Sequence, residues 1–126
     1  MRLPDIRVGE HYRPEQLLRQ SGPMCLLDGV MGYGPDWIET RVDVRPDSRF
    51  GDAAGVPAWV GIEYMAQTIA AWSGIEHVQA GERPRIGLLV GCRRYACEVA
   101  RFAPGQSLRV RAEFLMGDEL EFAVFR

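Results

Sequence analysis

The sequence has few of the residues from which metal centres and disulfide frameworks are built. Its three cysteines, Cys25, Cys92 and Cys97, are odd in number and lack a tight spacing, which favours reduced thiols over disulfides. Cys92 and Cys97 have no histidine near them, so the four nitrogen or sulfur ligands of a structural zinc site are not at hand. The sequence therefore implies neither a metal nor another cofactor.

Excess positive charge and long apolar runs are equally scarce. The formal net charge is −2, which argues against a nucleic-acid partner. No apolar run is long enough to span a membrane, because Glu63 and Gln67 interrupt the longest one, and the N-terminus has no signal-peptide core. We therefore expect a cytoplasmic protein without membrane contact, and the length of 126 residues predicts a single domain over residues 1–126.

The most informative stretch is the apolar run from Val56 to Trp72. It predicts a helix from Ala58 to about Val78, with Pro57 at the first helical position and Gly81 as the terminator. The helix is apolar on nearly every side, so other parts of the chain have to cover it.

One acid, Glu63, interrupts this helix, and Gln67 follows one turn later on the same face. Burial of an unpaired carboxylic acid is costly. Glu63 is therefore either hydrogen-bonded for a structural reason or used in chemistry.

Alternating side chains predict strands on both sides of the helix. Residues 37–45 alternate apolar and charged side chains most regularly, and residues 107–116 also alternate, which indicates one buried and one wet face. Further strands are expected at 24–31, 86–91, 93–99 and 120–126, a short helix at 13–19, a break at 20–23 and a loop at 46–55. One long helix among antiparallel strands predicts an α+β fold, with a curved sheet wrapped around the helix.

The stretch from Arg49 to Gln67 resembles the hotdog-fold 3-hydroxyacyl-acyl-carrier-protein dehydratases. The signature of that family is H-F-P-x-x-P-x-M-P-G-V-L-x-x-E-x-x-x-Q, and this chain has R-F-G-D-A-A-G-V-P-A-W-V-G-I-E-Y-M-A-Q without a gap. Phe50, Pro57, Glu63 and Gln67 fall on the family's phenylalanine, proline, acid and glutamine. The resemblance implies a hotdog fold.

Two further segments extend the resemblance to roughly residues 17–125. Residues 18–30 read L-R-Q-S-G-P-M-C-L-L-D-G-V, which is similar to the family's L-P-H-R-x-P-F-L-L-V-D-R-V. Residues 94–105 are similar to the family's strand, turn and P-G-D. The segment V-P-A-W-V-G-I-E-Y-M-A-Q is more similar to a divergent branch of the family, the dehydratase-like proteins of bacterial aryl-polyene gene clusters.

Two positions depart from the family pattern. The family's catalytic histidine falls on Arg49, and the glycine whose backbone N–H faces the thioester oxygen falls on Ala58. The second change keeps the backbone donor. Dehydration, however, needs a base for the α-proton and an acid for the leaving hydroxyl, and an arginine stays protonated at neutral pH. Asp52 or His77 could in principle replace the base, although His77 lies roughly 20 Å beyond Glu63 at about 1.5 Å per residue.

The resemblance implies roles for particular residues, each with a purely structural or solvated role as the alternative. Glu63 is expected to be the general acid, Gln67 its orienting partner, and the Ala58 N–H the donor to a developing oxyanion. The expected substrate-binding residues surround this motif: Arg49, Phe50, Val56, Pro57 and Trp59, with Arg49 near the phosphopantetheine arm. The candidates for docking an acidic acyl carrier protein are Arg93 and Arg94.

Three functions stay open at this point. The first is a 3-hydroxyacyl-acyl-carrier-protein dehydratase, or half of one, in fatty-acid or polyene-type biosynthesis, acting on a carrier-protein or CoA thioester. The second is a hotdog thioesterase in which Glu63 attacks the acyl thioester or directs water at it. The third is a non-catalytic acyl-binding subunit that stabilises a dehydratase partner.

The resemblance also implies a dimer joined through the sheets, in which the histidine of one subunit meets the acid of the other. A homodimer and a heterodimer with a paralogue that keeps the histidine are both compatible with this. The chain ends in a predicted strand at Phe125 and Arg126, whereas members of the family usually continue further. The C-terminal strands are therefore either missing from this sequence or replaced by another sheet edge.

Overall fold

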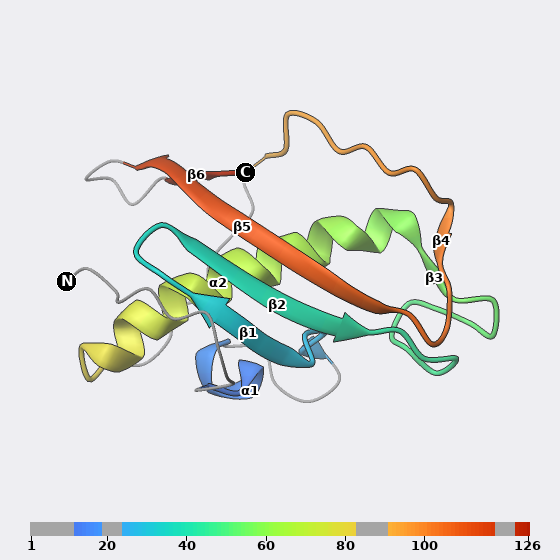
Figure 1. The fold of residues 1–126 in the computed structure, drawn as a ribbon, viewed down its shortest axis with the longest axis horizontal. Helices are drawn as coiled ribbons and strands as arrows, with labels where there is room; N and C mark the ends of the chain where they lie inside the picture. The colour runs from blue at the N-terminus through green and yellow to red at the C-terminus, as the bar shows by residue number, and fades with distance from the viewer. Residues whose placement is uncertain (1–11, 19–23, 83–90, 118–122) are drawn as a thin grey trace.

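The computed structural model describes residues 12–18, 24–82, 91–117 and 123–126. One long helix, α2 (Gly61–Gln79), packs against an antiparallel four-stranded sheet of order β1-β2-β5-β6 (Figure 1). Its strands are β1 (Gly29–Tyr33), β2 (Trp37–Asp43), β5 (Ser107–Gly117) and β6 (Ala123–Phe125). The smaller elements are α1 (Pro14–Leu17), β3 (Val56–Pro57), the 3₁₀ turn η2 (Ala58–Val60) and β4 (Arg101–Phe102). The arrangement confirms the predicted α+β class.

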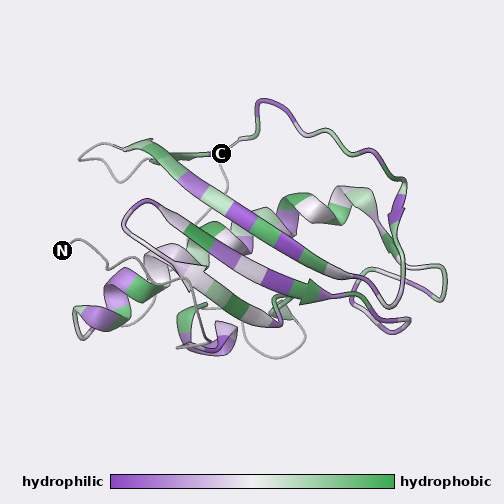
Figure 2. Ribbon diagram, viewed as in Figure 1, coloured by the Kyte–Doolittle hydropathy of each residue, from purple (hydrophilic) through white to green (hydrophobic). Residues whose placement is uncertain are grey.

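The centre of the sheet is the pair β2 and β5, both of which the alternation of side chains predicts correctly. Their antiparallel register places Ile38 opposite Ala112 and Thr40 opposite Val110, and all four of these side chains are buried. Apolar and polar residues alternate along both strands (Figure 2). Of the strand expected at 120–126, the described residues contain β6, which pairs antiparallel with β5.

The core lies between the inner face of this sheet and one side of α2. Tyr64, Thr68, Ala71 and Ile75 follow each other at helical spacing, and all four are buried. Each fully buried aliphatic side chain contributes about 1.5–3 kcal/mol. The hydroxyls of Thr40 and Thr68 meet at 2.7 Å across the helix–sheet contact, so the two buried polar groups satisfy each other.

The C-terminal end of α2 follows from local sequence, whereas its N-terminal end does not. Gly81 has a φ of +76°, its N–H donates to the Val78 carbonyl, and the Glu82 N–H donates to the His77 carbonyl. These two bonds are the Schellman pattern, which a glycine permits. The sequence predicted Pro57 at the first helical position, and this prediction is wrong. Pro57 is extended, with φ −57° and ψ 140°, pairs with Arg101 in the small β3–β4 sheet, and precedes η2.

The strand predicted at 24–31 begins only at Gly29, so its first half is wrong. Residues 25–28 have no regular structure. Two backbone groups at the start of this segment bond to the side chain of Gln67 and not to a neighbouring strand. The Leu26 N–H donates to Oε1 of Gln67, and the Met24 carbonyl accepts from Nε2. At Met24 and Leu26 the side chain of a helix residue thereby replaces strand pairing, which begins only with the bond from the Asp28 N–H to the Arg41 carbonyl.

The strand predicted at 93–99 is absent from the described chain, and this prediction is wrong as well. Residues 91–100 have no regular structure, and all of them except Tyr95 are solvent-exposed. A strand needs a neighbour to pair with, whereas this segment is bonded to Ala58 in η2 through the Tyr95 hydroxyl and the Ala100 carbonyl. The strand expected at 86–91, apart from Gly91, and the break expected at 20–23 lie outside the described residues.

Candidate active site

The predicted pair of Glu63 and Gln67 lies on α2 with its side chains in contact. Nε2 of Gln67 donates to Oε1 of Glu63 at 3.1 Å. Gln67 is only 1% exposed, and its amide also donates to the Met24 carbonyl at 2.8 Å and accepts from the Leu26 N–H at 2.9 Å. Both N–H groups and the oxygen of the amide are therefore used, which fixes its orientation.

Glu63 is half-buried, and within the described residues Gln67 is its one hydrogen-bond partner. The amide holds one carboxyl oxygen and leaves the other for a further contact. A carboxyl group that is oriented on one side and open on the other can hold or transfer a proton. The structure thus brings together the acid and the orienting residue that the sequence singled out.

Ala58, the first residue of η2, is bonded to the segment at residues 91–100, which follows α2 in the sequence. The Ala58 N–H donates to the Ala100 carbonyl at 3.0 Å, and the Ala58 carbonyl accepts from the Tyr95 hydroxyl. The Tyr95 hydroxyl is the donor in this bond, and burial raises the pKa of Tyr95 above that of a free tyrosine. The Ala58 N–H, predicted to bind an oxyanion, is therefore already bonded in this conformation.

Tyr95 is a site residue that the sequence did not reveal as such, because it lies in a stretch predicted as a strand. A Cβ atom on Gly61 would lie 2.1 Å from the Tyr95 hydroxyl oxygen. Gly61 therefore leaves the room in which the hydroxyl reaches Ala58. That Gly61 has to be small in order to accommodate Tyr95 can be recognised only from the structure, because the two residues are distant in the sequence.

Arg49, Phe50 and Trp59 form an exposed group beside the start of η2. Phe50 is 47% exposed and Trp59 64% exposed, and their ring centroids are 6.4 Å apart. The guanidinium carbon of Arg49 lies 5.8 Å from the Phe50 ring centroid. Of the other two expected substrate-binding residues, Pro57 is half-buried and Val56 is fully buried in the core.

The remaining candidates are spread over the molecule. Arg93 and Arg94 are exposed, as a docking role requires. Asp52, one alternative base, is ion-paired with Arg101 at 3.3 Å. His77, the other, lies near the C-terminal end of α2, and its buried Nδ1 has no hydrogen-bond partner among the described residues.

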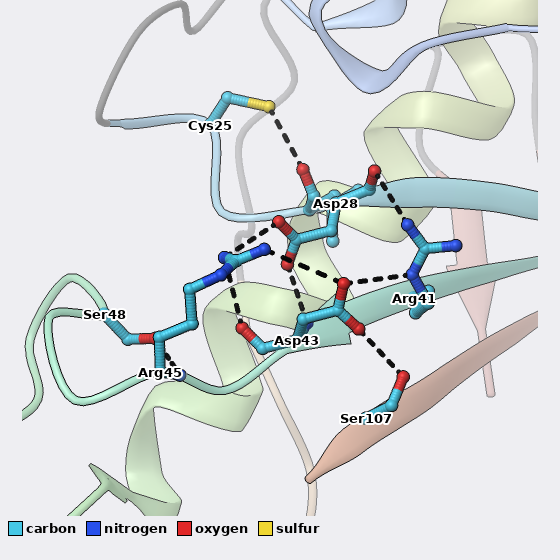
Figure 3. Close-up of polar contacts among 8 residues, drawn as sticks. Cys25, Asp28, Arg41, Asp43, Arg45, Ser48 and Ser107 are labelled. Atoms are coloured by element: carbon cyan, nitrogen blue, oxygen red, sulfur yellow. Dashed lines mark hydrogen bonds and ion pairs between the residues drawn. The ribbon is translucent and has the colours of Figure 1, made fainter. Parts of the chain in front are cut away.

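A network of alternating charges fixes the strand end that leads to the Arg49 loop (Figure 3). The two oxygens of Asp28 accept from the Asp43 N–H at 2.6 Å and from Arg45 at 3.2 Å. Asp43 in turn accepts from Arg41 at 3.3 Å and from the Ser107 hydroxyl at 2.9 Å. The negative charges of two carboxylates are paired with the positive charges of two guanidinium groups, so we assign this cluster a structural role. The sequence predicted these residues only as the solvent-exposed face of a strand.

The described residues contain no group of three or more side chains arranged to hold a metal ion. Among the helices of the described chain, none is long and apolar enough to cross a membrane.

Two comparisons with known proteins match the chain. A family model described as ApeP-like, ApeP dehydratase, matches residues 12–126. Among solved structures, the chain is similar to the dehydratase heterocomplex ApeI:P from Xenorhabdus doucetiae, with a TM-score of 0.82 and 29% sequence identity over 91% of this chain and 78% of that chain. No curated protein sequence matches. The matches confirm the resemblance to dehydratase-like proteins of the aryl-polyene type that the sequence motifs indicated.

Proposed function

The chain belongs to the ApeP-like dehydratase family, and from this premise we propose that it is one subunit of a hotdog-fold dehydratase acting on a 3-hydroxyacyl thioester. In this reaction a base removes a proton from the α-carbon, the hydroxyl leaves the β-carbon with a proton from an acid, and a double bond forms between the two carbons. The products are water and a 2,3-unsaturated acyl thioester.

The contact between Glu63 and Gln67 is the observation that carries this proposal. Gln67 holds one oxygen of the Glu63 carboxyl, and its own amide is fixed by the backbone at Met24 and Leu26. Glu63 therefore presents its second oxygen in a defined direction. In the proposed mechanism this carboxyl group gives its proton to the leaving hydroxyl.

The base is the part that this chain does not supply. Arg49 stands at the family's histidine position, and a guanidinium group stays protonated at neutral pH. In the described residues Asp52 is paired with Arg101, and His77 is 14 residues beyond Glu63 on α2, which is about 21 Å at 1.5 Å per residue. We propose that a second dehydratase subunit brings the histidine to the Glu63 site.

The likeness to a heterocomplex of dehydratase subunits supports this arrangement. It favours a heterodimer over the homodimer that the sequence left open. The α+β architecture, with one long helix against an antiparallel sheet, is compatible with the hotdog fold that the motifs imply.

The thioester oxygen would be held at the start of η2. For the Ala58 N–H to bind it, the bond to the Ala100 carbonyl has to open, and a backbone donor aimed at a developing oxyanion can stabilise it strongly. The exposed side chains of Arg93 and Arg94 belong to the segment that Tyr95 ties to Ala58. An acidic carrier protein docked on them would deliver its phosphopantetheine arm close to this donor.

The test is reconstitution with a 3-hydroxyacyl-carrier-protein substrate. The protein would be assayed alone and after co-expression with a histidine-containing dehydratase-like subunit from the same genome, with mass spectrometry following water loss and thioester cleavage separately. We expect water loss only from the complex, at a rate above that of the second subunit alone. Equal rates with and without this chain would contradict a catalytic role and leave the non-catalytic acyl-binding subunit. Cleavage by this chain alone, abolished in Glu63→Gln, would identify the thioesterase instead.

A further inference from the structure

Phe50 holds a backbone conformation that an aromatic residue rarely adopts. Its φ is +67°, and it is the one non-glycine residue with a positive φ in the part of the chain that the structure describes. The Gly51 N–H donates to the Ser48 carbonyl at 3.0 Å, which closes a β-turn with Phe50 at the third position. A turn with positive φ at this position normally has glycine or asparagine there. A bulky side chain at positive φ is strained.

Packing inside the chain does not account for the phenylalanine. Its side chain is 47% exposed, and its neighbours are the exposed ring of Trp59 and the exposed guanidinium group of Arg49. A glycine or asparagine would suit the turn better and would expose less apolar surface. Strain that is not needed for folding collects at functional positions, so the ring is kept for a contact outside this chain.

The position of Trp59 indicates what that contact is. Trp59 lies in η2, which runs directly into α2, and it precedes Glu63 by four residues, so it flanks the N-terminal end of the helix that carries the acid. Met24, whose backbone carbonyl is bonded to Gln67, is a further exposed apolar residue in this region. A subunit that brings a base to a substrate held by Glu63 has to approach this part of the molecule.

We infer that Arg49, Phe50 and Trp59 are the anchor on which the second dehydratase subunit docks. This inference rests on the proposed function, because it takes that subunit as the occupant. Aromatic residues and arginine are the types that dominate the energetics of protein interfaces. Phe50 then lowers the stability of the isolated chain in exchange for affinity in the complex.

The test compares two measurements on the same variants, the Tm of the isolated chain and the Kd of its complex with the co-expressed histidine-containing subunit. Phe50→Asn relieves the turn and removes the ring, so we expect Tm to rise by about 3–6 °C and Kd to rise at least about tenfold. Phe50→Tyr keeps the ring and should leave both values near those of the wild type. Trp59→Ala does not alter the turn and should raise Kd without raising Tm.

A Kd within about twofold of the wild type for both Phe50→Asn and Trp59→Ala would overturn the inference while leaving the proposed dehydratase complex in place. A raised Kd without any gain in Tm would overturn the claim that Phe50 is kept at the expense of stability. Failure of the wild-type chain to bind the histidine-containing subunit at all would contradict both this inference and the proposed function.

Discussion

Gln67 donates a 3.1 Å hydrogen bond to Glu63, one helical turn earlier, while the rest of its amide is bonded to the backbone of Met24 and Leu26. The orientation of the proposed acid therefore depends on a segment that is distant in sequence. Gln67 has two roles: it ties the segment at residues 24–26 to α2, and it orients the Glu63 carboxyl.

Gln67→Ala should destabilise the protein as well as misplace Glu63. The substitution leaves the Leu26 N–H and the Met24 carbonyl without partners; an unsatisfied buried group costs about 1–3 kcal/mol, and these two groups are only partly buried. We expect the free energy of unfolding to fall by about 1–3 kcal/mol in urea titrations. Gln79→Ala is the matched control, because Gln79 is half-buried on the same helix and its bond to Tyr12 is long, at 3.4 Å. Similar losses in the two variants would contradict the assigned role.

Gly61→Ala should act through Tyr95. The added Cβ would meet the Tyr95 hydroxyl at 2.1 Å, which outweighs the gain of about 0.5–1 kcal/mol that alanine normally brings in a helix. We expect a net destabilisation, a smaller one for Tyr95→Phe, and less than the sum of the two in the double variant. Gly91→Ala is the control, since a Cβ there would meet nothing within 4 Å. Additive losses would show that the two residues act independently.

Alkaline pH should weaken the fold through its buried tyrosines. Burial raises the pKa of Tyr64 and Tyr95. A raised pKa in the folded state leaves stability intact below the pKa of unfolded tyrosine, about 10, and removes it as pH rises through the folded pKa. We expect Tyr95→Phe to reduce the loss of unfolding free energy above about pH 10 relative to the wild type.

Burial also raises the pKa of the Cys25 thiol, which brings a decline that begins at lower pH in both proteins. The comparison is therefore made between Tyr95→Phe and the wild type at each pH, with urea unfolding as the readout. Parallel curves for the two proteins would contradict the assignment to Tyr95.

The sequence predicted the parts of the fold that repeat a simple period. Ile38, Thr40 and Val42 alternate with charged residues, and this is sufficient to identify β2 and its buried face. The end of α2 was equally accessible, because Gly81 is the residue that a left-handed helix end requires. In both cases neighbouring residues contain the whole signal.

Two of the errors arise where one side chain replaces a backbone partner far away in the sequence. The Gln67 amide bonds the Met24 carbonyl and the Leu26 N–H, which a strand would have paired with a neighbouring strand, and the Tyr95 hydroxyl bonds to Ala58 from a segment that has no regular structure. Local pattern does not contain such contacts. The pairing of Glu63 with Gln67 could be predicted, because the two residues are only one helical turn apart. The positive φ of Phe50 could not, because only the backbone conformation in the structure reveals it.

The most direct measurement of the central claim is the dehydration rate of the two-subunit complex with Glu63→Gln in this chain. Glutamine has the same shape and still accepts the bond from Gln67, but it has no proton to transfer. We expect the rate of 2,3-unsaturated thioester formation to fall by about 10²–10⁴-fold, with the complex still assembled, and Glu76→Gln on the same helix to remain near the wild-type rate. An unchanged rate in Glu63→Gln would contradict the account and assign the acid to another group.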